Sequence, residues 1–187
     1  MKQITLLFLL IVQSTIAQNS LFNQIEAKNI GPTIMSGRVV DLAVNPKNPT
    51  EFYVAYATGG LWYTNNNGTS FSPVMDSAET VNCGSVTVDW NSGTIWVGTG
   101  EVNASRSSYA GVGVLKSSDK GKTWENLGLK DSHHISRIWV NPSNLNEIVV
   151  AAGGHLYTTN KERGIYKSTD GGKSWKQTLF VANDTGI

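Results

Sequence analysis

An eight-residue polar motif recurs along this chain and constrains its fold more than any other feature. The segment "SSDKGKTW" at 117–124 returns about fifty residues later as "STDGGKSW" at 168–175, and a weaker copy, "TNNNGTSF", stands at 64–71. Self-similarity at a fixed spacing of this length is the sequence pattern of a repeat architecture. The chain is therefore expected to contain three copies of one supersecondary unit.

Each copy occupies the same place in a longer unit of four short runs. The third unit reads "ISRIWVNP", "EIVVAAGG", "GIYKSTDGG" and "SWKQTLF". Runs of β-branched and aromatic residues separated by Asn, Pro and Gly are strand and turn signals. Four strands per unit, repeated at this spacing, indicate a blade of a β-propeller. We predict an all-β chain whose antiparallel four-stranded blades span residues 36–76, 84–130 and 133–181, so that the ring is incomplete.

The repeated motif is interpreted as a structural turn between the third and fourth strands of each blade. Its glycine takes a positive φ at no steric cost, its Asp or Asn accepts hydrogen bonds from turn amides, and its Ser or Thr adds a hydroxyl contact. The aromatic residue is expected to fold back over its own hairpin. The predicted structural residues are Thr64, Asn66, Gly68, Phe71, Ser117, Asp119, Gly121, Trp124, Ser168, Asp170, Gly172 and Trp175.

The pattern S-x-D-x-G-x-x-W resembles the Asp-box, or BNR repeat, of sialidase-like propellers, xyloglucanase-like glycosidases and sortilin/Vps10-like receptors. The stretches "GPTIMSGRVVDLAVNPKNP", "TGGLWYTNNNG", "GTGEVN" and "RGIYKSTDGGKSW" resemble the start of large secreted bacterial glycosidase-like proteins with this repeat, from about Gly31 to the end of the chain. In those families the box is a structural hairpin away from the binding site. The resemblance implies a propeller and an N-terminal fragment of a longer protein.

Three blades are too few to close a propeller. Rings of this kind have four or more blades, because only closure hides the faces and edges of the innermost strands. We therefore expect two uncovered faces, and we expect the remaining blades of the same longer chain to be partners of this segment. Expressed alone, the segment should associate or aggregate.

The first seventeen residues have the layout of a secretory signal peptide. One Lys precedes an apolar run from Ile4 to Val12, and small residues lead to Ala17. The run is too short to span a bilayer, and no later stretch is long and apolar enough to do so. We expect cleavage after Ala17, a lead-in over residues 18–35, and a secreted or cell-surface protein with no membrane span.

Composition excludes several classes of function. Fifteen Lys and Arg stand against fourteen Asp and Glu without clustering, so nucleic acid is not expected as a partner. Cys83 is the single cysteine, so no intrachain disulfide can form, and we interpret it as a small buried hydrophobe. The sequence gives no reason to predict a cofactor or a metal site.

The meander of each blade decides which loops share a face, because alternate strand ends point the same way. The loops between first and second strands and the repeated turns should lie together on what we call the turn face. The entries to the first strands and the connections between second and third strands should form the opposite, loop face. Long polar loops on a rigid scaffold commonly carry binding. The candidate ligand-binding residues of the loop face are Arg38, Glu101, Asn103, Arg106, Tyr109, His134, His155 and Arg163.

Several candidates have a structural alternative. Arg38 can contact an anion or pair with Asp41 or Asp89 across blades. Glu101 is a weak candidate for a general acid, and a carboxylate that bonds loop amides is the alternative. His134 and its neighbour can also be solvated loop residues, and Tyr109 can stack on a sugar or be buried against the next blade.

Three functions fit these features. The first is an exported propeller that binds a glycan, a peptide or a protein on its loop face. The second is a glycoside hydrolase, which requires two carboxylates across the cleaved bond. The resemblance weakens this reading, because "YATGG" has Thr58 where xyloglucanase-like enzymes carry an Asp, and "SGRVV" lacks the Arg-Ile-Pro motif of sialidase-like enzymes. The third is a structural or docking propeller of a surface assembly.

Overall fold

Three antiparallel sheets of four strands each make up the described part of the chain, residues 37–105 and 108–187 of a computed structural model. They belong to the second of two compact units, residues 31–187. The predicted signal peptide and lead-in lie outside the described residues. The strands are β1 (Val39–Val44), β2 (Phe52–Tyr56), β3 (Gly60–Thr64), β4 (Ser72–Pro73), β5 (Cys83–Asp89), β6 (Thr94–Thr99), β7 (Val114–Ser117), β8 (Glu125–Asn126), β9 (Ile135–Val140), β10 (Ile148–Ala152), β11 (Gly164–Ser168) and β12 (Lys176–Leu179), with a short 3-10 helix η1 (Lys130–Ser132).

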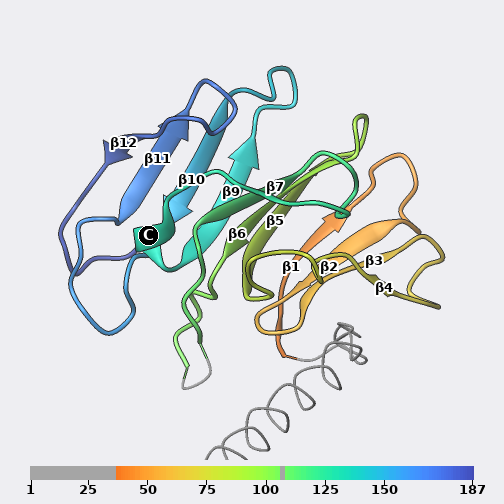
Figure 1. The fold of residues 1–187 in the computed structure, drawn as a ribbon, viewed down its shortest axis with the longest axis horizontal. Coiled ribbons are helices and arrows are strands. Elements are labelled where there is room, and N and C mark those ends of the chain that lie inside the picture. Colours follow the sequence, from red (N-terminus) through yellow and green to blue (C-terminus); the bar gives the residue numbers. More distant parts are fainter. Residues whose placement is uncertain (1–36, 106–107) are drawn as a thin grey trace, which may run out of the picture. The chain divides into compact units, whose positions relative to one another are not determined.

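Each sheet is a meander whose strands pair in chain order, as a propeller blade requires, and the three blades lie side by side (Figure 1). Hydrogen bonds join the first strands of neighbouring blades. The amide of Val86 in β5 donates to Asp41 in β1 at 3.0 Å, and the Thr87 hydroxyl donates to the carbonyl of Ile138 in β9 at 2.7 Å. The prediction of an all-β chain with an incomplete ring of blades is confirmed.

The core lies between the blades rather than within them. One apolar cluster joins the first and second blades around Leu61, Ile95 and Leu115, and another joins the second and third around Trp96 and Ile148. Cys83 is fully buried in the first cluster, and burial raises the pKa of its thiol to about 12. The thiol therefore stays neutral, as a buried apolar side chain does.

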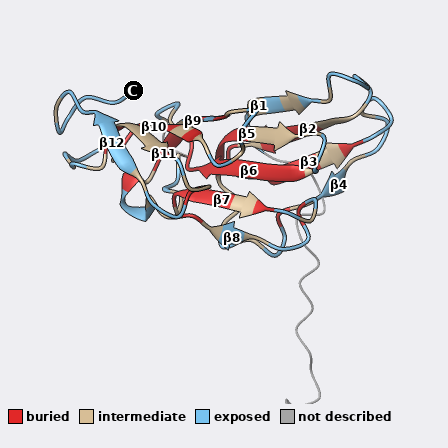
Figure 2. Ribbon diagram, turned by 90° about the horizontal axis from the view of Figure 1, so that it is seen from above, coloured by how far each residue is buried: buried red, intermediate tan, exposed pale blue. Residues whose placement is uncertain are grey.

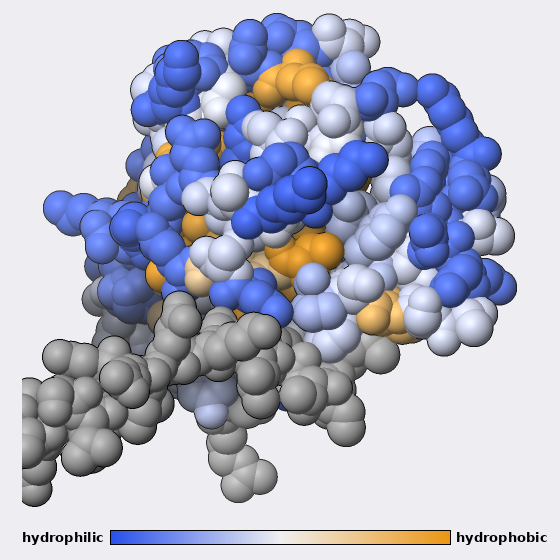
Figure 3. Space-filling model, turned by 45° about the vertical axis from the view of Figure 1, so that its right-hand side comes forward, coloured by the Kyte–Doolittle hydropathy of each residue, from blue (hydrophilic) through white to orange (hydrophobic). Residues whose placement is uncertain are grey.

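The middle blade is the best covered of the three, as Figure 2 shows by the buried β6 and the largely exposed β12. On the outer sides of the other two blades, apolar side chains remain exposed. Leu42 on β1 is 53% exposed, and Trp139 on β9 and Leu179 on β12 are about half exposed. Figure 3, which turns the side of the first blade forward, shows hydrophobic patches among hydrophilic residues. Apolar strand faces of this kind normally pack against another layer.

The repeated segments form the predicted turns, which we call octapeptide turns (residues 64–71, 117–124 and 168–175). In the second turn, the Ser117 hydroxyl donates to Asp119 at 2.8 Å and accepts from the Gly121 amide at 2.8 Å. The same carboxylate accepts the amide and hydroxyl of Thr123 at 2.9 and 2.6 Å. These bonds, from Thr123 first and then Ser117, lower the pKa of Asp119 to about 2.

The other two copies repeat this geometry. Asp170 accepts from the Ser168 hydroxyl at 2.7 Å and from the Ser174 amide and hydroxyl at 3.0 and 2.6 Å. In the first turn the Asn66 side-chain oxygen replaces the carboxylate, and it accepts from the Thr64 hydroxyl and the Ser70 amide at 2.9 and 3.0 Å. The Asn66 amide also donates to the Ser70 hydroxyl at 2.8 Å, so the weaker copy joins the same positions without the charge and with this one bond reversed.

The sequence predicted that the tryptophans of the turns fold back over their own hairpins, and this prediction is wrong. The indole N–H of Trp124 donates to the carbonyl of Val74 at 3.0 Å, and that of Trp175 donates to the carbonyl of Leu127 at 2.7 Å. Both acceptors lie just beyond the last strand of the preceding blade. A large aromatic side chain buries more area between two blades than over a two-strand hairpin, so each tryptophan clamps its blade to the one before it.

Backbone conformation and close packing both require glycine in each tryptophan-bearing turn. Gly121 and Gly172 have φ of 88° and 94°, in the left-handed region. A Cβ on Gly121 would also lie 2.7 Å from the Val74 side chain, and one on Gly172 would lie 2.6 Å from Leu127. The turn is therefore pressed against the same preceding blade that the tryptophan contacts.

The two predicted faces are confirmed by backbone hydrogen bonds. On the turn face, the Asn67 amide donates to the Thr50 carbonyl and the Gly171 amide donates to the Asn146 carbonyl, both at 2.9 Å. Each octapeptide turn so bonded therefore lies beside the loop between the first and second strands of its own blade.

Replacing Trp175 by Phe should remove the indole hydrogen bond while it keeps most of the apolar contact. We expect a loss of about 1 kcal/mol in the free energy of unfolding, the usual net value of one hydrogen bond. Urea denaturation measures it. The matched control is Trp139→Phe at the half-exposed position on β9, where a change within about 0.5 kcal/mol is expected. Equal losses for both variants would contradict the clamp.

Candidate functional site

The loop face is assembled by one repeated backbone contact. In each blade the amide of the first residue after the second strand donates to a backbone carbonyl at the entry to the first strand. The pairs are Ala57 to Arg38, Gly100 to Asn82 and Gly153 to His134, at 2.8 to 2.9 Å. These bonds hold the entries beside the connections that follow the second strands. The candidate residues of both kinds are therefore brought to one face.

Arg38 pairs with Glu101, not with Asp41 or Asp89 as the sequence alternatives proposed. The Arg38 Nε donates to Glu101 Oε1 at 2.8 Å, and its Nη2 donates to Oε2. The Glu101 side chain is 1% exposed, whereas Arg38 is 46% exposed. The hydrogen bond raises the pKa of Arg38. This two-pronged ion pair links the entry of the first blade to the end of β6, and it occupies both carboxylate oxygens.

The long connection of the second blade, residues 100–112, follows Glu101 and is called the second-blade loop. The Ser108 hydroxyl contacts Glu101 Oε2 at 3.3 Å and the Asn103 carbonyl at 3.0 Å, so it folds the loop back on itself. Asn103 is exposed, and Tyr109 is 58% exposed. Arg106, another candidate, lies outside the described residues. Tyr109 is thus available to a ligand rather than buried against the third blade.

Arg163 shapes the connection of the third blade, residues 153–163, which is called the third-blade loop. Its guanidinium donates to the carbonyls of Gly153 and Thr158 at 2.8 Å each, and also to that of His155. Arg163 is 6% exposed, and its Nε has no hydrogen-bond partner among the described residues. Most of its donors are therefore used to hold the loop, and one buried N–H remains unsatisfied.

Three histidines gather where the two loops meet the entry to β9. The rings of His133 and His155 stack with centroids 3.6 Å apart and planes 18° apart, and His134 lies edge-on to His133 at 6.4 Å. Burial lowers the pKa of His133, and His155 lowers it further. Burial also lowers the pKa of His134, followed by the effect of His133. Both shifts favour the neutral imidazole at His133 and His134.

Side chains of the third-blade loop also contact η1 and the second-blade loop. The Nε2 of His155 contacts the Asp131 carbonyl at 3.1 Å, and its Nδ1 contacts the Thr158 hydroxyl at 2.9 Å. The Tyr157 hydroxyl donates to the Ser105 carbonyl of the second-blade loop at 2.9 Å, while the tyrosine itself is 74% exposed. Tyr157 was not among the predicted candidates. An aromatic residue inside the polar stretch "HLYTTNKERG" is the signal that could have indicated it.

A cavity of about 430 Å³ opens beside these loops. Its lining combines backbone and side chains of β9, the third-blade loop and the last residues of the chain: Val102, Ser136, Gly153, His155, Leu156, Arg163, Asp184, Gly186 and Ile187. Its volume lies within the usual range of small-molecule sites. Of the predicted residues, His155 and Arg163 therefore lie at one cavity, whereas Arg38 and Glu101 form a separate ion pair.

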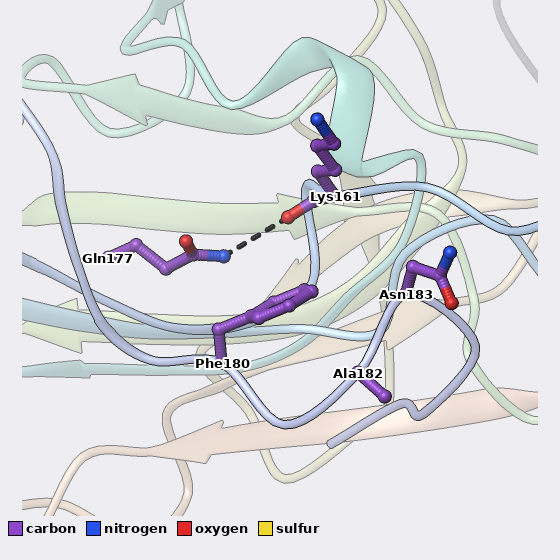
Figure 4. A pocket seen from close by; sticks show the side chains of 5 residues that line it. All are labelled: Lys161, Gln177, Phe180, Ala182 and Asn183. Carbon is purple, nitrogen blue, oxygen red and sulfur yellow. Dashed lines mark hydrogen bonds between the residues drawn. The ribbon is translucent and has the colours of Figure 1, made fainter.

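Another cavity, of about 450 Å³, follows the last strand β12 and is shown in Figure 4. The Gln177 amide donates to the Lys161 carbonyl at 3.1 Å, and the Phe180 ring lies beside this bond, with Ala182 and Asn183 completing the lining. The side chains around it are one aromatic ring, two amides, one methyl group and the Lys161 amine.

Within residues 37–105 and 108–187, no group of three or more His, Cys, Asp and Glu side chains is arranged to hold a metal ion. Over the same residues, no helix is long and apolar enough to cross a membrane. The one buried carboxylate of the face, Glu101, is engaged by Arg38. Exposed rings, amides and backbone groups remain to contact a ligand.

The comparisons with known proteins place the chain among β-propellers. An ancestral GH74 enzyme superposes with a TM-score of 0.63 at 22% identity over 86% of this chain and 21% of that one. The GH74 xyloglucanase from Xanthomonas campestris gives 0.53 at 18% identity over 73% and 21%. YCF48 bound to D1 peptide gives 0.54 at 14% identity over 82% and 42%.

These likenesses define the fold alone. All three identities are below the level at which a shared function follows, and fold does not imply function. The chain spans about a fifth of the length of the two GH74 proteins and about two fifths of YCF48. No protein-family model and no curated protein sequence matches the chain.

The Arg38–Glu101 pair should be coupled energetically. Arg38→Met, Glu101→Gln and the double variant form a double-mutant cycle, for which we expect a measurable favourable coupling in the free energy of unfolding. The control cycle uses Lys130 and Glu79, a pair at 3.4 Å whose side chains are both about half exposed, and its coupling should stay below about 0.5 kcal/mol. Equal coupling in the two cycles would show that the pair is an ordinary surface contact.

Proposed function

We propose that the protein is an exported β-propeller binding module that holds a glycan, peptide or protein ligand on its loop face. The observation that carries this proposal is the joining of the second-blade and third-blade loops beside a cavity of about 430 Å³. The Tyr157–Ser105 hydrogen bond fixes the two loops relative to each other, and the His155–Asp131 contact holds the third-blade loop against η1. A surface ordered before binding loses less conformational entropy when a ligand arrives.

The exposed side chains of this surface suit recognition of polar ligands. Tyr109 and Tyr157 are the most exposed tyrosines among the loop residues, at 58% and 74%. Tyrosine offers a flat apolar face and a polar tip, and it is enriched in binding surfaces for that reason. The structure of YCF48 with a D1 peptide supports the inference that this fold can present a peptide-binding surface.

A glycoside hydrolase is the second candidate function, favoured by the two GH74 structures. Such an enzyme needs an acid and a second carboxylate on opposite sides of the scissile bond. The carboxylate of Glu101 is buried and both of its oxygens accept hydrogen bonds from Arg38, so neither oxygen is free to contact a glycosidic bond. Catalytic groups would then have to come from further blades. A docking propeller of a surface assembly is the remaining alternative, and export rests on the signal peptide predicted at residues 1–17.

Binding and release can be followed in one experiment. The protein is incubated with plant, algal and sialylated polysaccharides and with a peptide library, and both retention and new reducing ends are measured. We expect retention of one ligand class without sugar release. Tyr109→Ala and Tyr157→Ala should each weaken it about five-fold or more, as loss of an aromatic contact residue does.

The control is Lys122→Ala, an exposed position in the second octapeptide turn, which should leave binding unchanged. Equal weakening by this variant would contradict the assignment of the loop face. Sugar release by the wild type that Glu101→Gln abolishes would instead make the protein a glycosidase.

We also infer that further propeller blades of the same longer chain cover the outer sides of the first and third blades. The support is the exposed apolar side chains there, Leu42 and Val44 on one side and Trp139 and Leu179 on the other. These residues stand on strand faces that point away from the middle blade. A blade packed on each side would remove them from water.

Without such blades the chain should self-associate. Sedimentation velocity at about 5 to 100 μM should show a mass that rises with concentration, driven by burial of apolar strand faces. The variant Leu42→Lys/Trp139→Lys should remain monomeric, whereas the control Lys47→Glu/Lys173→Glu should behave as the wild type. A wild-type chain that stays monomeric throughout would contradict the inference.

A further inference from the structure

A third cavity lies on the turn face, between the first and second blades and away from the loop face. It measures about 330 Å³ and is lined by Asn45, Glu51, Tyr53, Tyr63, Val88, Trp90, Asn91, Ser92, Gly93 and Lys120. The first four come from the first blade, and the others come from β5, the loop after it and the second octapeptide turn. The cavity is therefore built at an interface between two blades.

Glu51 is an anionic group in the wall of this cavity. Its Oε1 accepts the Tyr63 hydroxyl at 2.5 Å, and its Oε2 accepts the Asn45 amide at 2.7 Å. These two bonds lower the pKa of Glu51, the Tyr63 bond first. Among the described residues Glu51 forms no ion pair. The carboxylate is thus held in place by neutral donors, and its charge is not neutralised by direct contact.

The third blade contains the same arrangement with the charge neutralised. Glu147 accepts the Asn141 amide at 2.7 Å, as Glu51 does from Asn45. The residue on the adjacent third strand is Lys167, which forms an ion pair with Glu147. The matching position in the first blade is Tyr63. The first blade therefore has Tyr63 in place of the lysine, and the charge of Glu51 remains available to a bound cation.

Aromatic rings form much of the rest of the wall. Tyr53 lies 4.9 Å from Tyr63 and 5.5 Å from Trp90, between ring centroids. Tyr53 is 4% exposed, and its hydroxyl makes no hydrogen bond within the described residues. Burial, followed by the charge of Glu51, raises the pKa of Tyr53 to about 12, so the ring stays neutral. Three electron-rich rings beside a carboxylate form the usual environment of a bound organic cation.

The corresponding place between the second and third blades, among the described residues, is a much smaller cavity. Its sequence reads "TIW" at 94–96 where the first blade reads "EFY" at 51–53, so a threonine replaces the carboxylate and a larger tryptophan replaces Tyr53. Trp96 is 1% exposed, and the space left there is about 60 Å³. Blade packing by itself therefore does not require the larger opening.

Two lysines stand near the opening. Lys120, in the second octapeptide turn, is exposed, and its aliphatic stem lies against Gly93. Its charge acts on Glu51 from a distance, without an ion pair. Lys47 is held outside the cavity, where it donates to the Asn91 side chain at 2.9 Å. A cationic ligand would therefore be repelled by Lys120, so removal of this charge should strengthen its binding.

We propose that this inter-blade cavity is a binding site for an organic ammonium group, held by the Glu51 carboxylate and the rings of Tyr53, Tyr63 and Trp90. The group can belong to a small amine or to a lysine side chain of a peptide. The site is independent of the loop face and of the ligand proposed for it.

The test measures binding of four probes to the chain by isothermal titration calorimetry and by the indole NMR signal of Trp90, assigned with Trp90→Phe. The probes are choline, n-butylammonium, Nα-acetyl-lysine methylamide and, as a neutral probe, glucose, all at constant ionic strength. We expect millimolar affinity for at least one ammonium probe and no shift with glucose. Choline or butylammonium alone would indicate a small-amine site, and the lysine derivative would indicate a peptide side chain.

Three variants decide the assignment. Glu51→Gln should weaken ammonium binding about ten-fold, because it removes the charge and keeps the hydrogen-bonding shape. Glu147→Gln, the matched control in the third blade, should leave it unchanged. Lys120→Met should tighten binding about three-fold by removing the repulsion. Binding of glucose in place of the ammonium probes, an equal effect of both glutamate variants, or no shift of Trp90 with any probe would overturn the proposal. None of these outcomes depends on binding at the loop face.

Discussion

The contact of the second and third octapeptide turns with the preceding blade is the interaction on which the rest of the structure depends. A four-stranded blade has two flat faces and cannot bury both by itself, so its stability comes from its neighbours. Trp124 and Trp175 each donate a hydrogen bond to the preceding blade. Gly121 and Gly172 of the same turns allow the backbone to approach that blade closely. The hydroxyl and carboxylate network of the turn holds the tryptophan in position. One motif thus closes a hairpin and joins two blades.

This arrangement separates the two faces of the protein by role. On the turn face, the octapeptide turns repeat one hydrogen-bonded geometry. On the loop face, a repeated backbone bond fixes only the start of each connection, and the connections after β6 and β10 lengthen beyond it without disturbing the core. Arg38–Glu101 and Arg163 then order these long loops from within. Strong polar groups that resemble catalytic residues in the sequence are used mainly to organise a surface.

The turn face nevertheless differs at one interface. The first blade keeps the Asn–Glu pair that the third blade also has, but Tyr63 stands where Lys167 neutralises the glutamate. A carboxylate without an ion pair, placed beside three aromatic rings, costs free energy that packing of the two blades does not require. The interface around Trp96 leaves only about 60 Å³ against about 330 Å³ here, so the larger opening is not a general result of blade packing.

The sequence by itself determined the strands, the turns and the two faces, because strand alternation, turn residues and the repeat are local patterns with one structural solution. Asp119 and Ser117 could be assigned to a turn from eight residues alone. Only the tertiary structure decided the partners of long side chains. Trp124 reaches a neighbouring blade, Arg38 pairs with Glu101 across more than sixty positions, and Tyr157 bridges two loops. Such contacts depend on how separate blades pack, and no local pattern of residues specifies which side chains of different blades meet.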